Sequence, residues 1–380
     1  MANQKKILFA INHLTYGGIQ TQAITLAKEF RSRGAKIYFF WTDKFDDDFV
    51  DRELRQNGFE IIDGKFIKNQ YWAKYSRHLN RYVPLIKAIL LMRYYRIDYI
   101  IPYHNPLCYF FGAIHPYTSA KLTVYHIRNT VLENEPKQSW QFKKALNHAS
   151  IIIANSNHAR LKFKEVYGKH YDLNIRTIHN GIKLREIDNN TDWKTFFKVK
   201  DYNFIVTSLA NFFKDKDYTT IFKAWSIFIK KTNSKSILLV AGDEGIEGFK
   251  LRYQSEVQNL GLENKVRFIG RTSYNLELLS ISNCNILSTL NEGLPNSVIE
   301  TLGMKTPFIG AKVDGVEEVV GENYPIPRFA VGDHQQLADI LFKLYNREYS
   351  LEEINSYSSK RFQKFSIDKL LKEYSKIIKV

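Results

Sequence analysis

The chain has 380 residues, which at roughly 100–200 residues per domain favours two domains over one. Hydrophobic residues make up 44% and charged residues 25%, so the composition excludes a disordered tail or a fibrous repeat. The two cysteines, Cys108 and Cys284, are far apart and belong to no CxxC pattern. This spacing argues against a disulfide framework and a cysteine-based zinc site, and it fits a reducing cytosol.

The net charge is strongly basic and unevenly distributed. Lys plus Arg number 55 against 39 Asp plus Glu, a formal charge of +16. Residues 1–190 hold 29 basic and 16 acidic side chains (+13), whereas residues 191–380 hold 26 and 23 (+3). We therefore expect an anionic partner to meet the N-terminal half.

The apolar runs of the N-terminal half indicate strands, not targeting or membrane segments. Ile7–Ile11 is too short for the core of a signal peptide and leads into a Gly-Gly turn. The longest uncharged stretch, Tyr99–Ala120, contains prolines and a glycine that would break a helix in lipid. We expect no transmembrane segment and a cytoplasmic chain.

Runs of β-branched and apolar residues recur at the spacing of βα units. Between the first two runs, apolar residues from Ile19 to Phe30 follow helical spacing, and Gly34 stands where a C-terminal cap belongs. The strands predicted in the first half are Lys6–Ile11, Lys36–Trp41, Tyr99–Pro102, Leu122–Tyr125, Ile151–Ala154 and Ile175–Ile178. After the polar stretch Asp188–Lys200 the pattern resumes with Phe204–Leu209, Ser236–Ala241, Val266–Ile269, Asn285–Leu287 and Phe308–Gly310. The pattern predicts an α/β protein with two Rossmann-like, doubly wound parallel-sheet domains.

The first candidate site is the glycine pair Gly17-Gly18, between the first predicted strand and its helix. In open parallel sheets ligands bind beyond the carboxyl ends of the strands. Two glycines let backbone amides approach a ligand closely, and the helix N-terminus favours an anion. An ordinary βα turn is the alternative, because a GxGxxG pattern is absent.

The second candidate is the segment Asn291–Glu300. Glu292 stands in a loop, and Glu300 lies inside a helix that opens near Pro295. Such a loop can aim two carboxylates at hydroxyl groups while the helix N-terminal amides hold a diphosphate, an arrangement that suits a nucleotide sugar. The alternative is a Ser297–Glu300 capping box beside a solvated Glu292.

The third candidate is the loop Asn211–Asp217, in which lysines at a strand end can neutralise a diphosphate. A charged solvated loop is the alternative. Asp215-x-Asp217 imitates a metal-binding DxD motif, but its flanking lysines argue against a divalent cation.

The fourth candidate is His126, just past the predicted strand Leu122–Tyr125, with His104 as the alternative histidine. A lone histidine is more often structural than catalytic.

Taken in order, these motifs resemble the family-4 retaining glycosyltransferases (glycosyl transferases group 1 domain) of the GT-B fold. The E-x7-E pair Glu292…Glu300 is their most specific motif. Other segments that carry the resemblance are Ile178–Ile182, Leu238–Gly242, Val266–Gly270 and Val313–Glu318. Together the motifs cover nearly the whole chain.

The resemblance implies a role for individual residues. Glu300 would hold the ribose hydroxyls, Glu292 a hydroxyl of the donor sugar, and Lys216 would offset the charge developing on the leaving phosphate. His126 would lie near the acceptor and the reacting sugar, so His126, Glu292 and Lys216 are the implied catalytic residues. The remaining implied donor-binding residues are Gly17, Gly18, Asn211, Arg267, Phe268, Gly270, Gly293, Leu294, Pro295 and Asn296.

The resemblance also implies retention of anomeric configuration without a cofactor or a required metal. A UDP-sugar is favoured over a GDP-sugar as donor. One position departs from the family pattern: the arginine usual five residues before the lysine is Asn211 here. Phosphate stabilisation would then rest more heavily on Lys216.

The stretch Lys65–Ile97 contains eight basic residues, no acid and seven aromatics. Basic residues interleaved with aromatics suit an anionic membrane surface, where each charge contributes on the order of 1 kcal/mol. One alternative is a solvated basic face, and another is a surface that binds nucleic acid. We favour the membrane because members of the family often use lipid-linked acceptors.

We therefore expect a glycosyltransferase that moves a sugar from a nucleoside diphosphate sugar to a lipid-linked or saccharide acceptor in bacterial surface polysaccharide synthesis. It would work on the inner face of the cytoplasmic membrane. The expected parts are an acceptor-binding domain at 1–183, a donor-binding domain at 184–360, and a C-terminal helix at 361–380 that returns to the first domain. A nucleotide-sugar epimerase of the same fold and a non-catalytic membrane-bound relative are the competing interpretations.

Overall fold

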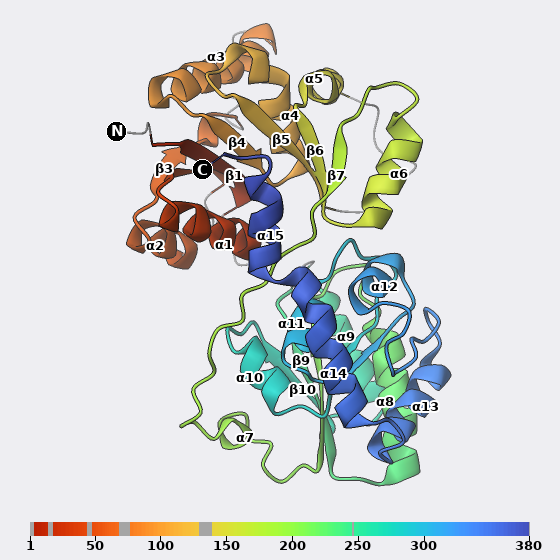
Figure 1. Ribbon diagram of the computed structural model, residues 1–380. Helices are drawn as coiled ribbons and strands as arrows, with labels where there is room; N and C mark the ends of the chain where they lie inside the picture. The colour runs from red at the N-terminus through yellow and green to blue at the C-terminus, as the bar shows by residue number, and fades with distance from the viewer. Residues whose placement is uncertain are drawn as a thin grey trace. The chain divides into compact units, whose positions relative to one another are not determined.

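The computed structural model describes residues 4–13, 18–43, 48–67, 77–128, 139–244 and 247–379. The chain forms two compact units (Figure 1). Unit 1 comprises residues 1–181 and 367–380, and unit 2 comprises residues 182–366. Each is built on one parallel sheet with helices around it, which confirms the predicted fold class. None of the helices within the described ranges is long and apolar enough to cross a membrane.

The sheet of unit 1 has seven strands in the order β3-β2-β1-β4-β5-β6-β7. They are β1 (Lys6–His13), β2 (Lys36–Asp43), β3 (Glu60–Asp63), β4 (Tyr99–Pro102), β5 (Leu122–Ile127), β6 (Ile151–Ala154) and β7 (Ile175–Thr177). Strand β3 was not predicted, because this four-residue edge strand has only two apolar residues, adjacent isoleucines with an acid on each side. Strand β5 continues to Ile127, two residues beyond its predicted end.

Helices cover both faces of this sheet. They are α1 (Gly18–Ser32), α2 (Asp48–Gln56), α3 (Arg77–Tyr95), α4 (Asn105–Ile114), α5 (Trp140–His148), α6 (Asn157–Tyr167) and α15 (Ile367–Ser375), with short 3-10 helices at Lys65–Ile67 and His115–Tyr117. Phe30 of α1 and Leu370 of α15 share a buried cluster with Phe9 of β1, and Figure 1 shows α15 beside α1. On the opposite face, Phe40 of β2 shares a second buried cluster with Phe111 of α4 and Met92 of α3. The C-terminal helix thus completes the core of unit 1.

The sheet of unit 2 has five strands in the order β10-β9-β8-β11-β12. They are β8 (Phe204–Leu209), β9 (Ser236–Ala241), β10 (Val266–Gly270), β11 (Cys284–Leu287) and β12 (Phe308–Gly310). Its helices are α7 (Trp193–Phe196), α8 (Tyr218–Thr232), α9 (Phe249–Asn259), α10 (Asn275–Ser280), α11 (Asn296–Gly303), α12 (Asp314–Val320), α13 (His334–Tyr345) and α14 (Leu351–Phe362), followed by a 3-10 turn at Gln363–Phe365.

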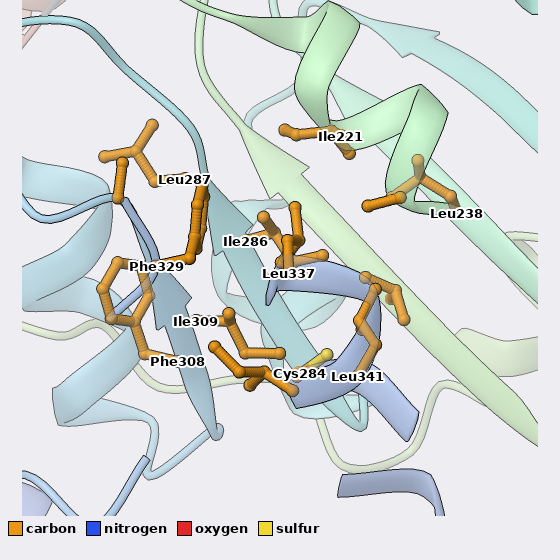
Figure 2. Packing of buried hydrophobic residues seen from close by; sticks show 14 of the residues in the cluster. Ile221, Leu238, Cys284, Ile286, Leu287, Phe308, Ile309, Phe329, Leu337 and Leu341 are labelled. Atoms are coloured by element: carbon orange, nitrogen blue, oxygen red, sulfur yellow. The ribbon is translucent and has the colours of Figure 1, made fainter. Parts of the chain in front are cut away.

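Figure 2 shows the larger core of unit 2, in which α13 packs on the sheet. Leu337 and Leu341 of α13 point at Ile286 of β11 and Ile309 of β12, and all four side chains are buried. Each such side chain contributes about 1.5–3 kcal/mol on burial. Because every strand of the sheet is parallel, all the carboxyl ends lie along one edge, and the polar loops that carry the site begin there.

Candidate functional site

The loops after β8 and β11 meet at the carboxyl edge of the unit 2 sheet. Lys216 forms an antiparallel bridge with Thr289. Leu290 N–H donates to Asp215 O at 2.8 Å, and Asp217 N–H donates to Ser288 O at 3.1 Å. Backbone pairing therefore fixes the lysine loop against the loop that carries Glu292.

The side chains of Lys216 and Glu292 form an ion pair across these loops. They are largely buried, with 13% and 20% of the side-chain surface exposed. Burial lowers the pKa of the Lys216 ammonium to about 8. The two residues that the resemblance assigned to the phosphate and to the donor sugar are thus in direct contact, and each neutralises the other.

Asn211, which replaces the family's arginine, has a structural contact. Its Oδ1 accepts from Asp243 N–H at 2.9 Å, so the amide joins the loops after β8 and β9. Asp217 of the DxD-like sequence caps α8, because its Oδ1 accepts from Thr220 N–H at 3.1 Å. Within the described ranges, no group of three or more His, Cys, Asp or Glu side chains is arranged to hold a metal ion.

The segment from Glu292 to Asn296 forms a tight turn into α11. Leu294 is buried, Pro295 occupies the N-cap position, and Asn296 is the first helical residue. Gly315 of α12 lies against the turn, since a Cβ at this position would be 2.3 Å from Glu292 O and 2.7 Å from Gly293 O. The Val313–Glu318 motif therefore has a structural reason: its glycine lets α12 contact the Glu292 loop.

Glu300 lies one turn inside α11. The capping-box alternative is wrong, because the N-cap is Pro295, no side chain caps the helix, and Ser297 is already helical. Burial raises the pKa of Glu300 to about 7, and the charge of Arg185 opposes that rise. Arg185 forms an ion pair with the buried Glu277 and donates to Ser273 O at 2.8 Å.

Strand β10 carries three further predicted residues. The Arg267 Nη1 donates to Phe197 O at 2.6 Å and to Lys198 O at 3.2 Å, so this side chain holds the turn after α7. Phe268 packs toward the core against the Phe212 ring, with centroids 6.1 Å apart. Gly270 has φ +77° with open space beside it, and its carbonyl accepts from Gly242 N–H at 3.0 Å.

The glycine pair of unit 1 lies at the edge of the described chain. Gly18 is the first residue of α1, and Gly17 falls outside the described residues. The glycine is therefore at the helix N-terminus expected from the sequence.

His126 is not in the position expected of a residue that contacts the sugar. It lies inside β5, 2% exposed, because the strand extends to Ile127. Its Nδ1 is 2.7 Å from Pro102 O and its Nε2 is 2.6 Å from Tyr374 Oη. Burial lowers the pKa of His126 to about 3, so the ring is neutral, Nδ1–H donates to Pro102 and Nε2 accepts from the tyrosine. Through these two contacts the histidine ties the C-terminal helix to the sheet.

Sequence reasoning missed Arg185, Glu277 and the contact made by Gly315. Arg185 belongs to unit 2 and lies 115 residues before Glu300 in the chain, and nothing in its flanking sequence indicates that the two charges interact. Asp314 and Gly315 belong to the Val313–Glu318 motif, but the contact of Gly315 with Glu292 depends on the tertiary packing of α12.

The two parallel-sheet units and the E-x7-E loop define a glycosyltransferase of the GT-B class. Residues 16–186 match the family model described as Glycosyltransferase Family 4, and residues 189–361 match the model described as Glycosyl transferases group 1. The chain therefore belongs to the family-4 retaining glycosyltransferases.

Known proteins of this kind are similar over most of their length. An uncharacterised glycosyltransferase of Methanocaldococcus jannaschii is 21% identical over 77% of this chain and 82% of its own. The structure of Anabaena HepE in complex with UDP and glucose has a TM-score of 0.81 at 17% identity, covering 98% of this chain and 99% of that one. WaaG, a glycosyltransferase involved in lipopolysaccharide biosynthesis, has a TM-score of 0.70 at 12% identity, with 98% and 99% coverage. At these identities the structures share the fold of this chain.

Proposed function

We propose that this glycosyltransferase moves a hexose from a UDP-sugar, with retention, to a lipid-linked or saccharide acceptor of a surface polysaccharide. The observation that carries the proposal is the Lys216–Glu292 ion pair at the carboxyl edge of the unit 2 sheet. The donor would separate this pair: its diphosphate takes the ammonium of Lys216, and a sugar hydroxyl donates to the Glu292 carboxylate. The ammonium then lies where negative charge develops on the leaving phosphate, and the carboxylate holds the sugar.

In the reaction the bond between the anomeric carbon and the phosphate oxygen breaks, and a bond from that carbon to the acceptor oxygen forms on the same face. The leaving phosphate takes the acceptor proton. Lys216 stabilises the UDP that is released, and Glu300 holds the ribose hydroxyls in its ionised form. HepE, a relative in fold, was solved with UDP and glucose, and WaaG acts in lipopolysaccharide synthesis, which supports this choice of donor and pathway.

Donor hydrolysis and UDP binding test the proposed donor site. We expect Lys216→Ala and Glu292→Ala each to lower turnover by about 10²–10³-fold, in the range of a lost oxyanion contact. Lys223→Ala and Glu263→Ala, at exposed positions of unit 2, are the matched controls and should behave as wild type. Nucleotide release that survives both site substitutions would disprove the assignment. Appearance of an epimerised nucleotide sugar would favour the epimerase, and binding without turnover the non-catalytic relative.

We also propose that α3 docks unit 1 on the inner face of the cytoplasmic membrane. Leu85, Ala88 and Met92 on one side of α3 are buried in the core. The opposite side presents a row at i, i+4 spacing, Tyr82, Ile86, Leu90 and Tyr94, whose exposed fractions run from 48% to 80%. We call these four residues the apolar row.

Cations flank the apolar row. Lys87 and Arg93 are exposed on the same helix, and the Arg93 Nε donates to the backbone of the exposed Tyr117 at 2.8 Å. Apolar side chains bordered by cations suit insertion into an anionic lipid surface. The predicted segment at 65–97 lies partly outside the described residues, since 68–76 are not included.

Vesicle flotation tests the membrane proposal. We expect binding to vesicles containing anionic lipid and weaker binding to neutral ones or at high salt. Ile86→Ser with Leu90→Ser should abolish flotation, whereas Leu161→Ser, exposed on α6 of the same unit, should not. Binding indifferent to lipid charge, to salt and to the double substitution would reject the proposal.

A further inference from the structure

Four polar side chains follow four neighbouring strands of the unit 1 sheet, all at the carboxyl edge. Tyr103 follows β4, Arg128 follows β5 and Asn155 follows β6, while Asn180 stands three residues after β7. None was a candidate from the sequence. Parallel pairing of β4 through β7 brings them together.

Arg128 is the centre of this group. Its guanidinium carbon lies 4.5 Å from the centroid of the Tyr103 ring, and its Nη1 donates to Asn180 Oδ1 at 2.8 Å. Asn155 Nδ2 donates to the Arg128 carbonyl at 3.1 Å, which fixes the backbone. The side chain therefore spans from the β4 side to the β7 side in one defined orientation.

The charge of Arg128 has no counter-charge in the part of the chain that the structure describes. No carboxylate there lies within ion-pair distance, and its partners are a neutral amide and an aromatic ring. A half-buried guanidinium whose described partners are all neutral keeps its attraction for an anion.

In the described chain, three buried atoms of the group also lack hydrogen-bond partners: the Tyr103 hydroxyl, the Arg128 Nε and the Asn155 Oδ1. The Arg128 Nε donor and the Asn155 Oδ1 acceptor are both buried and unpaired, and Asn155 is 5% exposed. Buried polar atoms are ordinarily satisfied, so an unpaired donor and acceptor on adjacent strand ends indicate that something else completes the group. An oxyanion that accepts from the guanidinium, carried by a molecule with a hydroxyl or a water that donates to Asn155, would satisfy both.

We infer that Arg128, with Asn155 and Asn180, is a binding site for a phosphoryl group of a substrate. The site itself stands on the contacts within unit 1, and only the identity of the substrate rests on the proposed function. Two sources carry a phosphoryl group: the diphosphate of the donor and the phosphate of a lipid-linked acceptor. Arg128 is then a substrate-positioning residue of unit 1.

Calorimetric titration of the full chain with inorganic pyrophosphate and with UDP tests this site. Pyrophosphate is titrated in a Lys216→Ala background, which removes the cation of unit 2. We expect Arg128→Gln to weaken pyrophosphate binding by between about tenfold and a hundredfold, the range for hydrogen bonds to charged groups. Asn180→Asp keeps the arginine but supplies an internal carboxylate, and it should weaken binding similarly. Arg176→Gln, exposed on β7, is the matched control and should bind as its parent.

The outcomes are distinct. If Arg128→Gln also weakens UDP binding in the otherwise unsubstituted chain, the donor is the source of the phosphoryl group; if UDP binding is unchanged, the acceptor is. Pyrophosphate binding that is absent in the Lys216→Ala parent, or equal in Arg128→Gln and the parent, overturns the inference. A protein that fails to bind UDP yet loses pyrophosphate binding on Arg128→Gln would contradict the proposed donor and leave this site standing. Thermal melting of each variant controls for folding.

Discussion

Three ionisable side chains of unit 2, Lys216, Glu292 and Glu300, are partly shielded from solvent at one edge of the sheet. Lys216 and Glu292 balance each other, whereas Glu300 makes no ion pair in the described chain and is only near Arg185. Burial of an unpaired carboxyl disfavours its charged form. The folded chain is therefore more stable when Glu300 is protonated. The ionised carboxylate, in contrast, is the form that can accept hydrogen bonds from two hydroxyl groups.

Because the protonated and ionised forms of Glu300 differ in this way, the stability of the fold should depend on pH. Burial raises the pKa of Glu300 to about 7 from its ordinary 4.5, so between these values the folded chain holds a proton that the unfolded chain releases. The free energy of unfolding therefore falls as pH rises through this window. Glu300→Gln should be more stable than wild type at pH 8, by roughly 1–3 kcal/mol, and nearly equal to it at pH 5.

Donor affinity should follow the opposite course. UDP-sugar binding to wild type should strengthen as pH rises through about 7, because Glu300 accepts the ribose hydroxyls as a carboxylate. Glu300→Gln should bind weakly at every pH. Calorimetry from pH 5.5 to 8.5 measures this, and a wild-type profile parallel to that of the variant would contradict it.

A single methyl group should disturb the same site from outside it. Gly315→Ala places a Cβ against Glu292 O and Gly293 O, which must move apart. We expect turnover to fall about tenfold or more, since small displacements of reacting groups have effects of this order. Gly332→Ala is the control. This glycine has a positive φ but open space around it, so the substitution should lower stability without affecting the site. Unchanged kinetics in Gly315→Ala would show that the loop tolerates the shift.

At the scale of elements, hydrophobic periodicity predicted most strands of both sheets, because buried parallel strands are continuous apolar runs. The ends of elements were less predictable. Extension of β5 to Ile127 moved His126 from a loop into the core, and β3 was missed because an edge strand needs few apolar residues. For α3 the sequence indicated an aromatic and basic segment, but only packing decided which aromatics face out.

The hydrogen bond between His126 and Tyr374 should hold α15 on the sheet. Tyr374→Phe leaves Nε2 of a buried, neutral imidazole without a donor, which costs about 1–3 kcal/mol. The double variant His126→Phe/Tyr374→Phe removes both partners and should recover part of that loss. Denaturant unfolding measures the cycle, with Tyr345→Phe as control, since its hydroxyl has no hydrogen bond in the described chain.

A catalytic histidine would behave differently. Under the structural role, His126→Phe lowers stability and increases hydrogen exchange in α15. Loss of turnover in a variant of unchanged stability and unchanged exchange would return His126 to the reaction.

At the scale of the whole molecule, the two units differ in whether their hydrophobic cores need the C-terminal segment. The clusters of unit 2 draw only on residues between 182 and 366, whereas unit 1 takes Ile367, Leu370, Leu371, Tyr374 and Ile378 from beyond unit 2. Unit 1 is therefore closed by a segment far along the sequence.

Fragments should reveal this asymmetry. We expect residues 182–366 to fold alone and to bind UDP, because their cores and the Lys216–Glu292 pair are self-contained. Residues 1–181 should be destabilised, and a peptide of residues 367–380 should raise their melting temperature. Equal thermal stability of residues 1–181 with and without the peptide would contradict this dependence.

The sequence by itself determined the α/β class, the two sheets, the family and the E-x7-E and lysine loops. These are properties of local periodicity and of motifs whose residues are near one another in the chain. The tertiary structure decided that Lys216 and Glu292 pair, that Gly315 contacts their loop, that His126 is buried against Tyr374, and that no counter-charge pairs with Arg128 among the described residues. Each of these depends on groups between 22 and 248 residues apart, which strand order and burial bring together, and no local pattern encodes such contacts.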